Sequence, residues 1–449
     1  MAAQDVEFVA DEGFYVQSAL AWNHYGFYGD QYRYLWPPGY PFFLSQCFAL
    51  SGANGLLIAK LLQILASGVT GAATMVFAHR LYGQRAATYA GILWIVYLPL
   101  IGFTHTLWSE SLFLALFVPG VLQLLGALES LQRNQTVGRK EGRSIGRHLI
   151  LAGLALAGAA YIKQAALFLI PLLGLLIAAY AGGSTKRRVW AASLFLLASL
   201  VPVLPWTLRN AEVYGRFVPV GATLGENVFR GINARYTNFD TLLVDAARKD
   251  RGLEPASPRE RLVTPPGSGW ERPEELPNLV ERQQTALSRG VGFAREHPKW
   301  FVRSRLQKLA DWVAPLSFFL RHQALGSYAN TPLGGDAVRR ATSIWALLCP
   351  FCVLALAVGG ASKLDHRPAA ALLGTVFAYF LATALLVSMS RFRIPVVPFC
   401  IVFAAGAFGR QAPARLLPTG LGIAALLFLW WLNLPVISGV LQAAWGTVA

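Results

Sequence analysis

The residues best suited to chemistry are ionisable side chains at the ends of long apolar stretches. Adjacent carboxylates open the segment D-E-G-F-Y at Asp11 and Glu12, and a third carboxylate, Glu110, lies in S-E-S-L-F. Lys60 interrupts the apolar run L-L-I-A-K-L-L-Q-I-L. Charge close to hydrocarbon is costly, so such residues are candidates for function. A carboxylate beside apolar surface suits a general base, and cations at the same depth suit a phosphate group.

Each of these residues also has a plain structural explanation. Acids such as Asp11 and Glu12 stabilise the first turn of a helix, and Ser109 with Glu110 is a typical helix start. His105 is more often a hydrogen-bonded structural residue than a base. Snorkelling of long cationic side chains to the interface explains Arg393 well and Lys60 less well.

Composition places the chain among integral membrane proteins. It has 449 residues, of which 55% are hydrophobic and 14% charged, against about 25% charged residues in soluble domains. The mean hydropathy is +0.45. Four scattered cysteines exclude a disulfide scaffold, and the C-P-F-C at Cys349 and Cys352 lies in an apolar run that indicates packing.

The elements that must position these residues are transmembrane helices. A helix needs about 20 apolar residues to cross a bilayer. The sequence therefore predicts an all-α membrane bundle of about ten spans. The predicted spans are 54–78, 86–104, 109–129, 148–162, 165–182, 190–208, 341–361, 368–388, 394–409 and 417–436.

The basic residues set the orientation. The five loops assigned to the inside hold 14 Lys and Arg residues and only two acids, which is the usual cytoplasmic bias. The net charge of +16 therefore reflects the membrane topology and attraction to anionic lipid headgroups. Nucleic acid is not an expected partner. This predicts a multi-pass protein of the cell's inner (plasma) membrane with its active site on the extracytoplasmic side.

Topology divides the chain into five predicted segments. They are a first outer loop with the acid motif at 1–53, transmembrane helices at 54–208, a long outer loop at 209–340, transmembrane helices at 341–436 and a short tail at 437–449. In the long loop, six prolines make 254–277 irregular, while 236–250 and 278–312 are predicted helices. The second has a mixed face suited to a membrane surface.

Several short motifs together resemble the C-type integral membrane glycosyltransferases, in the bacterial branch related to protein O-mannosyltransferases and to the lipid A aminoarabinose transferase. The motifs are D-E at 11–12, P-P-G-Y-P at 37–41, A-K-L-L-Q at 59–63, H-R-L-Y-G at 79–83, S-E-S-L-F at 109–113, P-W-T-L-R-N at 205–210, F-V-P-V with G-E-N at 217–227, and R-F-R-I-P-V-V-P at 391–398. The resemblance covers about residues 10–410. In that family a transmembrane helix precedes the D-E motif, so we expect one to be encoded upstream of this chain.

The resemblance implies a reaction and roles for the candidate residues. A monosaccharide would move from a polyprenyl phosphate to a hydroxyl of a lipid, glycan or protein acceptor, with inversion. Asp11 would be the base, with Glu12 and Glu110 in support. Lys60 and the pair of Arg391 and Arg393 would contact the lipid phosphate. The remaining expected substrate-binding residues are Arg33, Tyr40, His105 and Lys163.

No cofactor is expected, and a divalent metal lacks any ligand spacing in the sequence. The aromatic residues Tyr25, Phe27, Tyr28, Tyr32, Tyr34, Trp36 and Tyr40 suit either an interfacial belt or sugar stacking. Two other functions stay open. One is a transporter or flippase of a lipid-linked sugar, which would not need the paired carboxylates. The other is a non-catalytic scaffold of cell-wall assembly.

Overall fold

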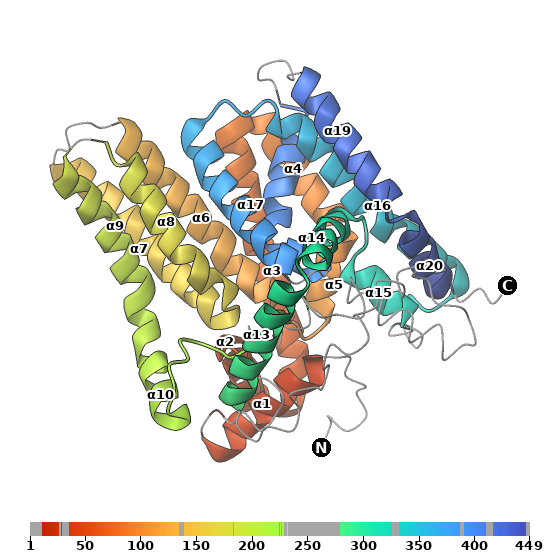
Figure 1. Ribbon diagram of the computed structural model, residues 1–449, viewed down its shortest axis with the longest axis horizontal. Helices are drawn as coiled ribbons and strands as arrows, with labels where there is room; N and C mark the ends of the chain where they lie inside the picture. Colours follow the sequence, from red (N-terminus) through yellow and green to blue (C-terminus); the bar gives the residue numbers. More distant parts are fainter. Residues whose placement is uncertain are drawn as a thin grey trace. The chain divides into compact units, whose positions relative to one another are not determined.

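The computed structural model describes residues 11–26, 28, 36–133, 139–182, 184–223, 225, 227–228, 231, 279–325, 328, 332–386, 390–409 and 416–445. Within these residues the regular elements are helices (Figure 1). By length and composition, six helices in the described part of the chain could cross a membrane, or up to eight spans if each of two bent pairs counts as one. The predicted all-α, multi-span membrane fold is confirmed.

The residues that the structure describes give fewer candidate spans than the predicted ten, because two apolar stretches form short helices. Helix α8 (Ala165–Tyr180) has 16 residues and α18 (Val397–Gly406) has 10, which is about 24 and 15 Å of helix against about 30 Å of hydrocarbon. The first three residues of the predicted span 394–409 belong to a 3₁₀ segment, Ser390–Val396, so the α-helix that follows is shorter than the predicted span.

The two bent pairs break beside a proline. Helices α4 (Gln84–Val96) and α5 (Leu98–His105) meet at 54°, and α19 (Leu416–Trp431) and α20 (Leu434–Trp445) meet at 59°. Pro99 and Pro435 occupy the second position of α5 and α20, where a missing N–H costs nothing. The first part of the predicted tail, 437–445, belongs to α20.

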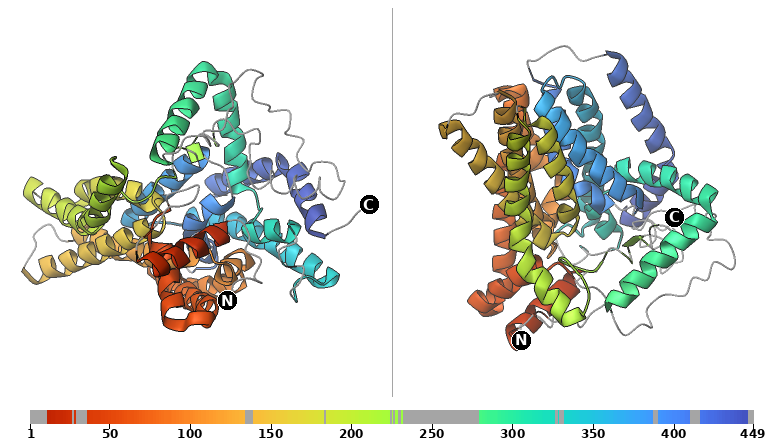
Figure 2. Two further views of the ribbon diagram at one scale, coloured as in Figure 1. Left: turned by 90° about the horizontal axis from the view of Figure 1, so that it is seen from below. Right: turned by 60° about the vertical axis from the view of Figure 1, so that its left-hand side comes forward.

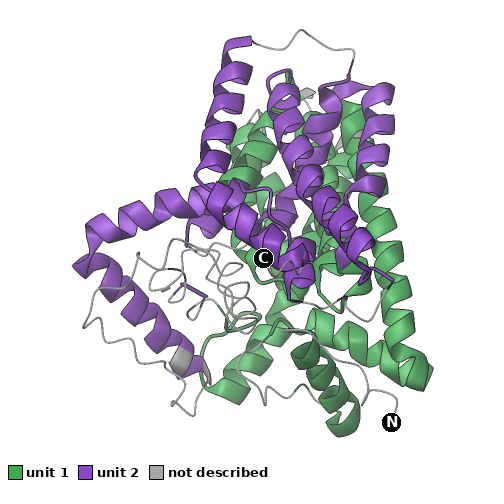
Figure 3. Ribbon diagram, turned by 90° about the vertical axis from the view of Figure 1, so that its right-hand side faces the viewer, with its two compact units in different colours: residues 1–81, 103–223, 364–379 green, residues 82–102, 224–363, 380–449 purple. Residues whose placement is uncertain are grey.

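The chain divides into two compact units (Figure 3), and each is described by itself. Unit 1 comprises residues 1–81, 103–223 and 364–379. It contains α1 (Asp11–Tyr25), α2 (Gly39–Ser51), nearly all of α3 (Gly55–Tyr82), α6 (Glu110–Arg133), α7 (Arg139–Ile162), α8, α9 (Thr185–Leu200), α10 (Leu204–Tyr214) and the first part of α17 (Arg367–Leu386).

Close helix packing in unit 1 depends on small residues. Helix α7 packs against α6 and α9. A Cβ placed on Gly153 of α7 would lie 2.6 Å from the Cβ of Ala198 in α9, and one on Gly120 of α6 would lie 3.1 Å from the Cβ of Ala155. Small residues let transmembrane helices approach closely, so these glycines fix the spacing of the bundle.

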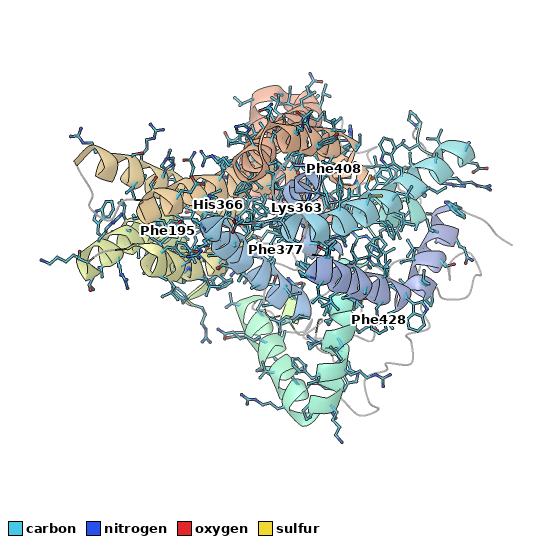
Figure 4. The ribbon with its side chains drawn as sticks, turned by 90° about the horizontal axis from the view of Figure 1, so that it is seen from above. Phe195, Lys363, His366, Phe377, Phe408 and Phe428 are labelled. Carbon is cyan, nitrogen blue, oxygen red and sulfur yellow. The ribbon has the colours of Figure 1, made fainter. Side chains whose placement is uncertain are left out.

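Polar contacts join the start of α17 to the end of α6. His366, labelled in Figure 4, precedes α17 and its Nε2 lies 3.3 Å from the Glu129 carboxylate of α6. Its Nδ1 accepts the backbone N–H of Ala369, 3.2 Å away, which caps α17. The first turn of α17 is therefore fastened to the end of α6.

Unit 2 comprises residues 82–102, 224–363 and 380–449. Helix α18 packs against α16 (Asp336–Ala361) and α4, and α20 packs against α15 (Phe318–Ala324). Two further helices, α13 (Leu279–Glu296) and α14 (Pro298–Val313), confirm the helical prediction for 278–312. The predicted helix 236–250 and the irregular stretch 254–277 lie outside the described residues.

Candidate functional site

The site of unit 1 is built around the turn between α5 and α6, at residues 104–109. The backbone N–H of Leu107 donates to the Glu12 carboxylate over 2.6 Å. The Gln63 amide donates to the carbonyl oxygens of Thr106 at 2.9 Å and Thr104 at 3.3 Å. A buried polar group is costly to leave unpaired, so these bonds fix helices α1 and α3 to one turn.

Tyr40 links a third helix to the same turn. Its side chain is fully buried, and its hydroxyl donates to Gln63 Oε1 over 2.6 Å. Its ring packs edge-on against Tyr15 of α1 at 4.9 Å between centroids. Glu12 and Glu110 both lie close enough to interact electrostatically with its hydroxyl. Tyr40, which the sequence predicts as a substrate contact, here joins α1, α2 and α3.

The start of α2 explains the glycine of the P-P-G-Y-P motif. A Cβ on Gly39 would lie 2.8 Å from the carbonyl oxygen of Tyr161 near the end of α7. That distance is too short for any other residue without backbone movement. Gly39 therefore allows the first turn of α2, and with it Tyr40, to lie against α7.

The three carboxylates have different surroundings. Asp11 is half-buried at the first position of α1, whereas Glu12 is 8% exposed. Consecutive helical residues point about 100° apart, so one faces the turn while the other remains accessible. Glu110 is fully buried at the start of α6, and its carboxylate pairs with Lys163 Nζ at 2.9 Å.

The cations of unit 1 differ in how many of their donors are occupied. Arg209 donates to Asn210 Oδ1, to the Tyr214 hydroxyl and to the Tyr28 carbonyl. Lys163 is held by Glu110. Lys60 is half-buried one turn before Gln63, and among the described residues it has no hydrogen bond or ion pair. Of these three cations, Lys60 is the one free to bind an anionic ligand.

Helix lengths place these residues at one membrane depth. Lys60 precedes Arg80 by 20 residues on α3, and Glu110 precedes Glu129 by 19 on α6. At a rise of 1.5 Å per residue these separations are about 30 and 29 Å, close to the thickness of the hydrocarbon core. These separations are long enough to put Arg80 and Glu129 at one boundary of a bilayer and Lys60 and Glu110 at the other.

Other predicted site residues lie apart from this network or outside the description. His105 ends α5 with its side chain exposed. Arg33 lies outside the described residues. Arg391 and Arg393 belong to unit 2, where Arg391 is half-buried.

The buried guanidinium of Arg393 donates to the carbonyls of Trp312, Ala314 and Leu316. These carbonyls lie in the last turn of α14 and just after it, where unpaired oxygens attract a cation. Its occupied donors favour a structural role for Arg393.

Unit 2 also buries charge that the sequence does not single out. Lys308 of α14 is 2% exposed, and burial lowers its pKa to about 7, with nearby Arg305 lowering it further and Asp311 opposing. His322 of α15 is 1% exposed, and burial, with Arg321 beside it, lowers its pKa well below the usual value. Both cationic forms are therefore disfavoured.

Aromatic side chains near α1 pack mainly on one another. Trp22 stacks on Trp206 at 6.2 Å and meets Tyr28 at 5.3 Å, while Arg209 lies 4.9 Å over the Trp206 ring. Tyr28 and Tyr40 are buried, whereas Tyr25 is 54% exposed. Ring faces occupied in this way are unsuited to stacking on a sugar. The predicted residues Phe27, Tyr32 and Tyr34 lie outside the described residues.

Sequence reasoning missed Gln63 and the turn carbonyls that it binds. A glutamine three residues after Lys60, inside an apolar helix, was the available signal, because a buried amide requires polar partners. The carbonyls of Thr104 and Thr106 carry no side-chain signature. Among the described residues, no group of three or more His, Cys, Asp or Glu side chains is arranged to hold a metal ion.

The fold and the site define a multi-span, all-α membrane protein with an acid and cation network at one boundary of the bilayer. No protein-family model and no curated protein sequence matches the chain. Among solved structures it is similar to ArnT from Cupriavidus metallidurans bound to undecaprenyl phosphate, with 15% identity and a TM-score of 0.37 over 90% of this chain and 74% of that one. The apo state of the same protein gives 16% identity and a TM-score of 0.36 over 90% and 73%.

Proposed function

We propose that this protein is a membrane glycosyltransferase that moves a monosaccharide from a polyprenyl phosphate to an acceptor hydroxyl. The observation that carries the proposal is the network of unit 1. It holds the carboxylate of Glu12 and the helix of Lys60 on a single turn. The acceptor class is a lipid, glycan or protein, and the site faces the extracytoplasmic side of the inner membrane.

The chemistry follows from where each group lies. Lys60 has the right depth for the phosphate of a lipid donor, and its ammonium stabilises charge that grows on that phosphate. Asp11, the more accessible carboxylate of the pair, takes the proton from the acceptor hydroxyl. The acceptor oxygen then bonds to the anomeric carbon, the bond from that carbon to the phosphate oxygen breaks, and the lipid phosphate leaves with the electron pair. One displacement inverts the anomeric centre.

The other groups support this arrangement. Glu12 is held by the Leu107 N–H and sets the position of α1 relative to the turn. The buried Glu110 and the half-buried Lys163 form an ion pair that joins α6 to the end of α7. Arg391 and Arg393 belong to unit 2, and their role as phosphate contacts stays a prediction from the sequence.

Transfer assays with Asp11→Asn test the proposal. The purified full chain is incubated with radiolabelled polyprenyl-phosphate sugars and a mixture of membrane acceptors. We expect the wild type to release polyprenyl phosphate and label an acceptor, and Asp11→Asn to lose transfer by at least about a hundredfold, as for a general base. Glu7→Gln, an acid only four residues away, is the matched control.

Movement of the intact lipid-linked sugar across a vesicle, unaffected by Asp11→Asn, would instead identify a flippase. Full transfer by the Asp11→Asn variant would remove Asp11 as the base.

A further inference from the structure

Helix α14 of unit 2 has an exposed face that combines cations with aliphatic side chains. Lys299, Val302, Arg303 and Leu306 are all exposed, with Val302 at 60% and Leu306 at 65%. Their spacing of i, i+3, i+4 and i+7 puts them on one side of the helix. No acid belongs to this face, so it presents two positive charges beside two apolar residues.

The opposite face of α14 is used by unit 2 itself. Ser304, Lys308 and Asp311 are buried, at 1%, 2% and 2% exposed. Helix α14 packs against α19 and the 3₁₀ segment Ser390–Val396. The exposed face is therefore the side of α14 that unit 2 leaves uncovered.

Contacts within unit 2 give the depth of α14. The Trp430 indole N–H donates to the carbonyl of Val313, the last residue of α14, over 2.7 Å. Trp430 and Trp431 end the apolar helix α19, and tryptophans are enriched where a span leaves the hydrocarbon. Figure 2 shows α14 running across the end of α19 instead of along it. The C-terminal end of α14 therefore lies at the membrane interface, and the rest of the helix extends sideways from it.

Helix α13 continues the same pattern. Leu287 and Val291, one turn apart, are 38% and 37% exposed, and Arg295 follows one turn later. The inner side of this helix pair has its own small core, in which Val228 and Phe293 pack with Trp300 and Phe301. The exposed apolar residues are therefore not the pair's own core.

We propose that the exposed faces of α13 and α14 bind the anionic phospholipid headgroups of the bilayer in which the protein is embedded. Two observations select lipid over a protein partner. The end of α14 lies at interface depth, and its exposed face joins cations to aliphatic groups without an acid. Amphipathic helices of this kind bury their apolar side chains among headgroups while Lys and Arg bind lipid phosphates.

Fluorescence of the full chain in nanodiscs tests the proposal. The four native cysteines are replaced, and Leu306→Cys carries an environment-sensitive dye. We expect its emission to shift to shorter wavelength, and spin-labelled lipids to quench it, in discs that contain phosphatidylglycerol. The emission shift and the quenching should both fall at least about twofold in discs of phosphatidylcholine alone. They should fall by a similar factor when salt rises from about 0.1 M to about 1 M, because the screening length then shortens from about 10 to about 3 Å. Glu296→Cys, also exposed but acidic in the native chain, is the matched site for a water-facing dye.

A charge variant provides a second measurement. The double substitution Lys299→Glu and Arg303→Glu should abolish the dependence on phosphatidylglycerol while leaving the helix content unchanged. Should the dye at Leu306 stay water-exposed in every disc, the proposal fails. The proposal also fails if spin-labelled lipids quench the dye equally in charged and neutral discs. A third contrary result is an emission shift that appears only when a second protein is added and that grows with the concentration of that protein. The salt series is measured with Lys299 and Arg303 intact. It therefore tests headgroup binding even if the charge variant does not fold.

Discussion

Replacing Lys60 with alanine is the most direct test of the proposed donor site. Lys60 is half-buried at the depth of lipid phosphates and has no polar partner among the described residues. Its removal leaves no buried acid unpaired, so the fold should tolerate the change. The loss should appear in binding of the donor.

The size of this loss follows from the kind of contact. A hydrogen bond to a charged group contributes about 1.5–3 kcal/mol, and each 1.4 kcal/mol is a factor of ten in an equilibrium constant. We therefore expect the Michaelis constant for the polyprenyl-phosphate sugar to rise about 10- to 100-fold. The turnover number should fall less, because the contact exists in both the ground state and the transition state.

The assay measures initial rates of transfer against donor concentration in detergent, with polyprenyl phosphate as a competing ligand. Leu61→Ala, at a neighbouring residue that is 48% exposed, controls for loss of packing on α3. Lys60→Arg retains the charge and should recover much of the affinity. A Michaelis constant equal to that of the wild type would refute a phosphate contact at Lys60.

Three further changes test the packing around the site and the buried charge. Gln63→Leu leaves the Tyr40 hydroxyl without its acceptor and should lower thermal stability by about 1–3 kcal/mol, while adding Tyr40→Phe should recover part of the loss; equal stability of wild type and single variant would contradict the network. Gly39→Ala forces a Cβ onto the Tyr161 carbonyl and should cost about 1–3 kcal/mol by the same measurement, whereas Gly68→Ala, which has open space, should cost nothing. Because burial lowers the pKa of Lys308 from 10.5 to about 7, the unfolded chain binds more protons between these values. Stability should therefore rise with pH there, by up to about 1.4 kcal/mol per pH unit. Lys308→Met should remove this part of the slope in pH-dependent melting, and an unchanged slope would contradict the assignment.

The sequence predicted the class of fold because bilayer thickness dictates the length of an apolar helix. It did not predict which prolines break a helix. Pro99 and Pro435 mark bends, yet Pro119 lies inside the continuous helix α6. A break depends on whether neighbouring helices supply partners for the freed carbonyls, and that information is tertiary.

The candidate site was predictable in part. Ionisable side chains at span ends identified Glu12, Glu110 and Lys60, because such charges are rare near hydrocarbon. The partners were not predictable. Glu12 binds a main-chain N–H and Gln63 binds main-chain carbonyls, and any residue type offers these groups. Arg393 illustrates the same limit, since the three groups that it binds are main-chain carbonyls.

The bond from Leu107 to Glu12 has a consequence for sequence divergence. Because the donor is a peptide amide, nineteen of the twenty standard amino acids retain it, and proline alone abolishes it. Side chains of the turn can therefore change while the Glu12 carboxylate keeps its partner. Related sequences should therefore vary broadly at position 107, with proline absent from it.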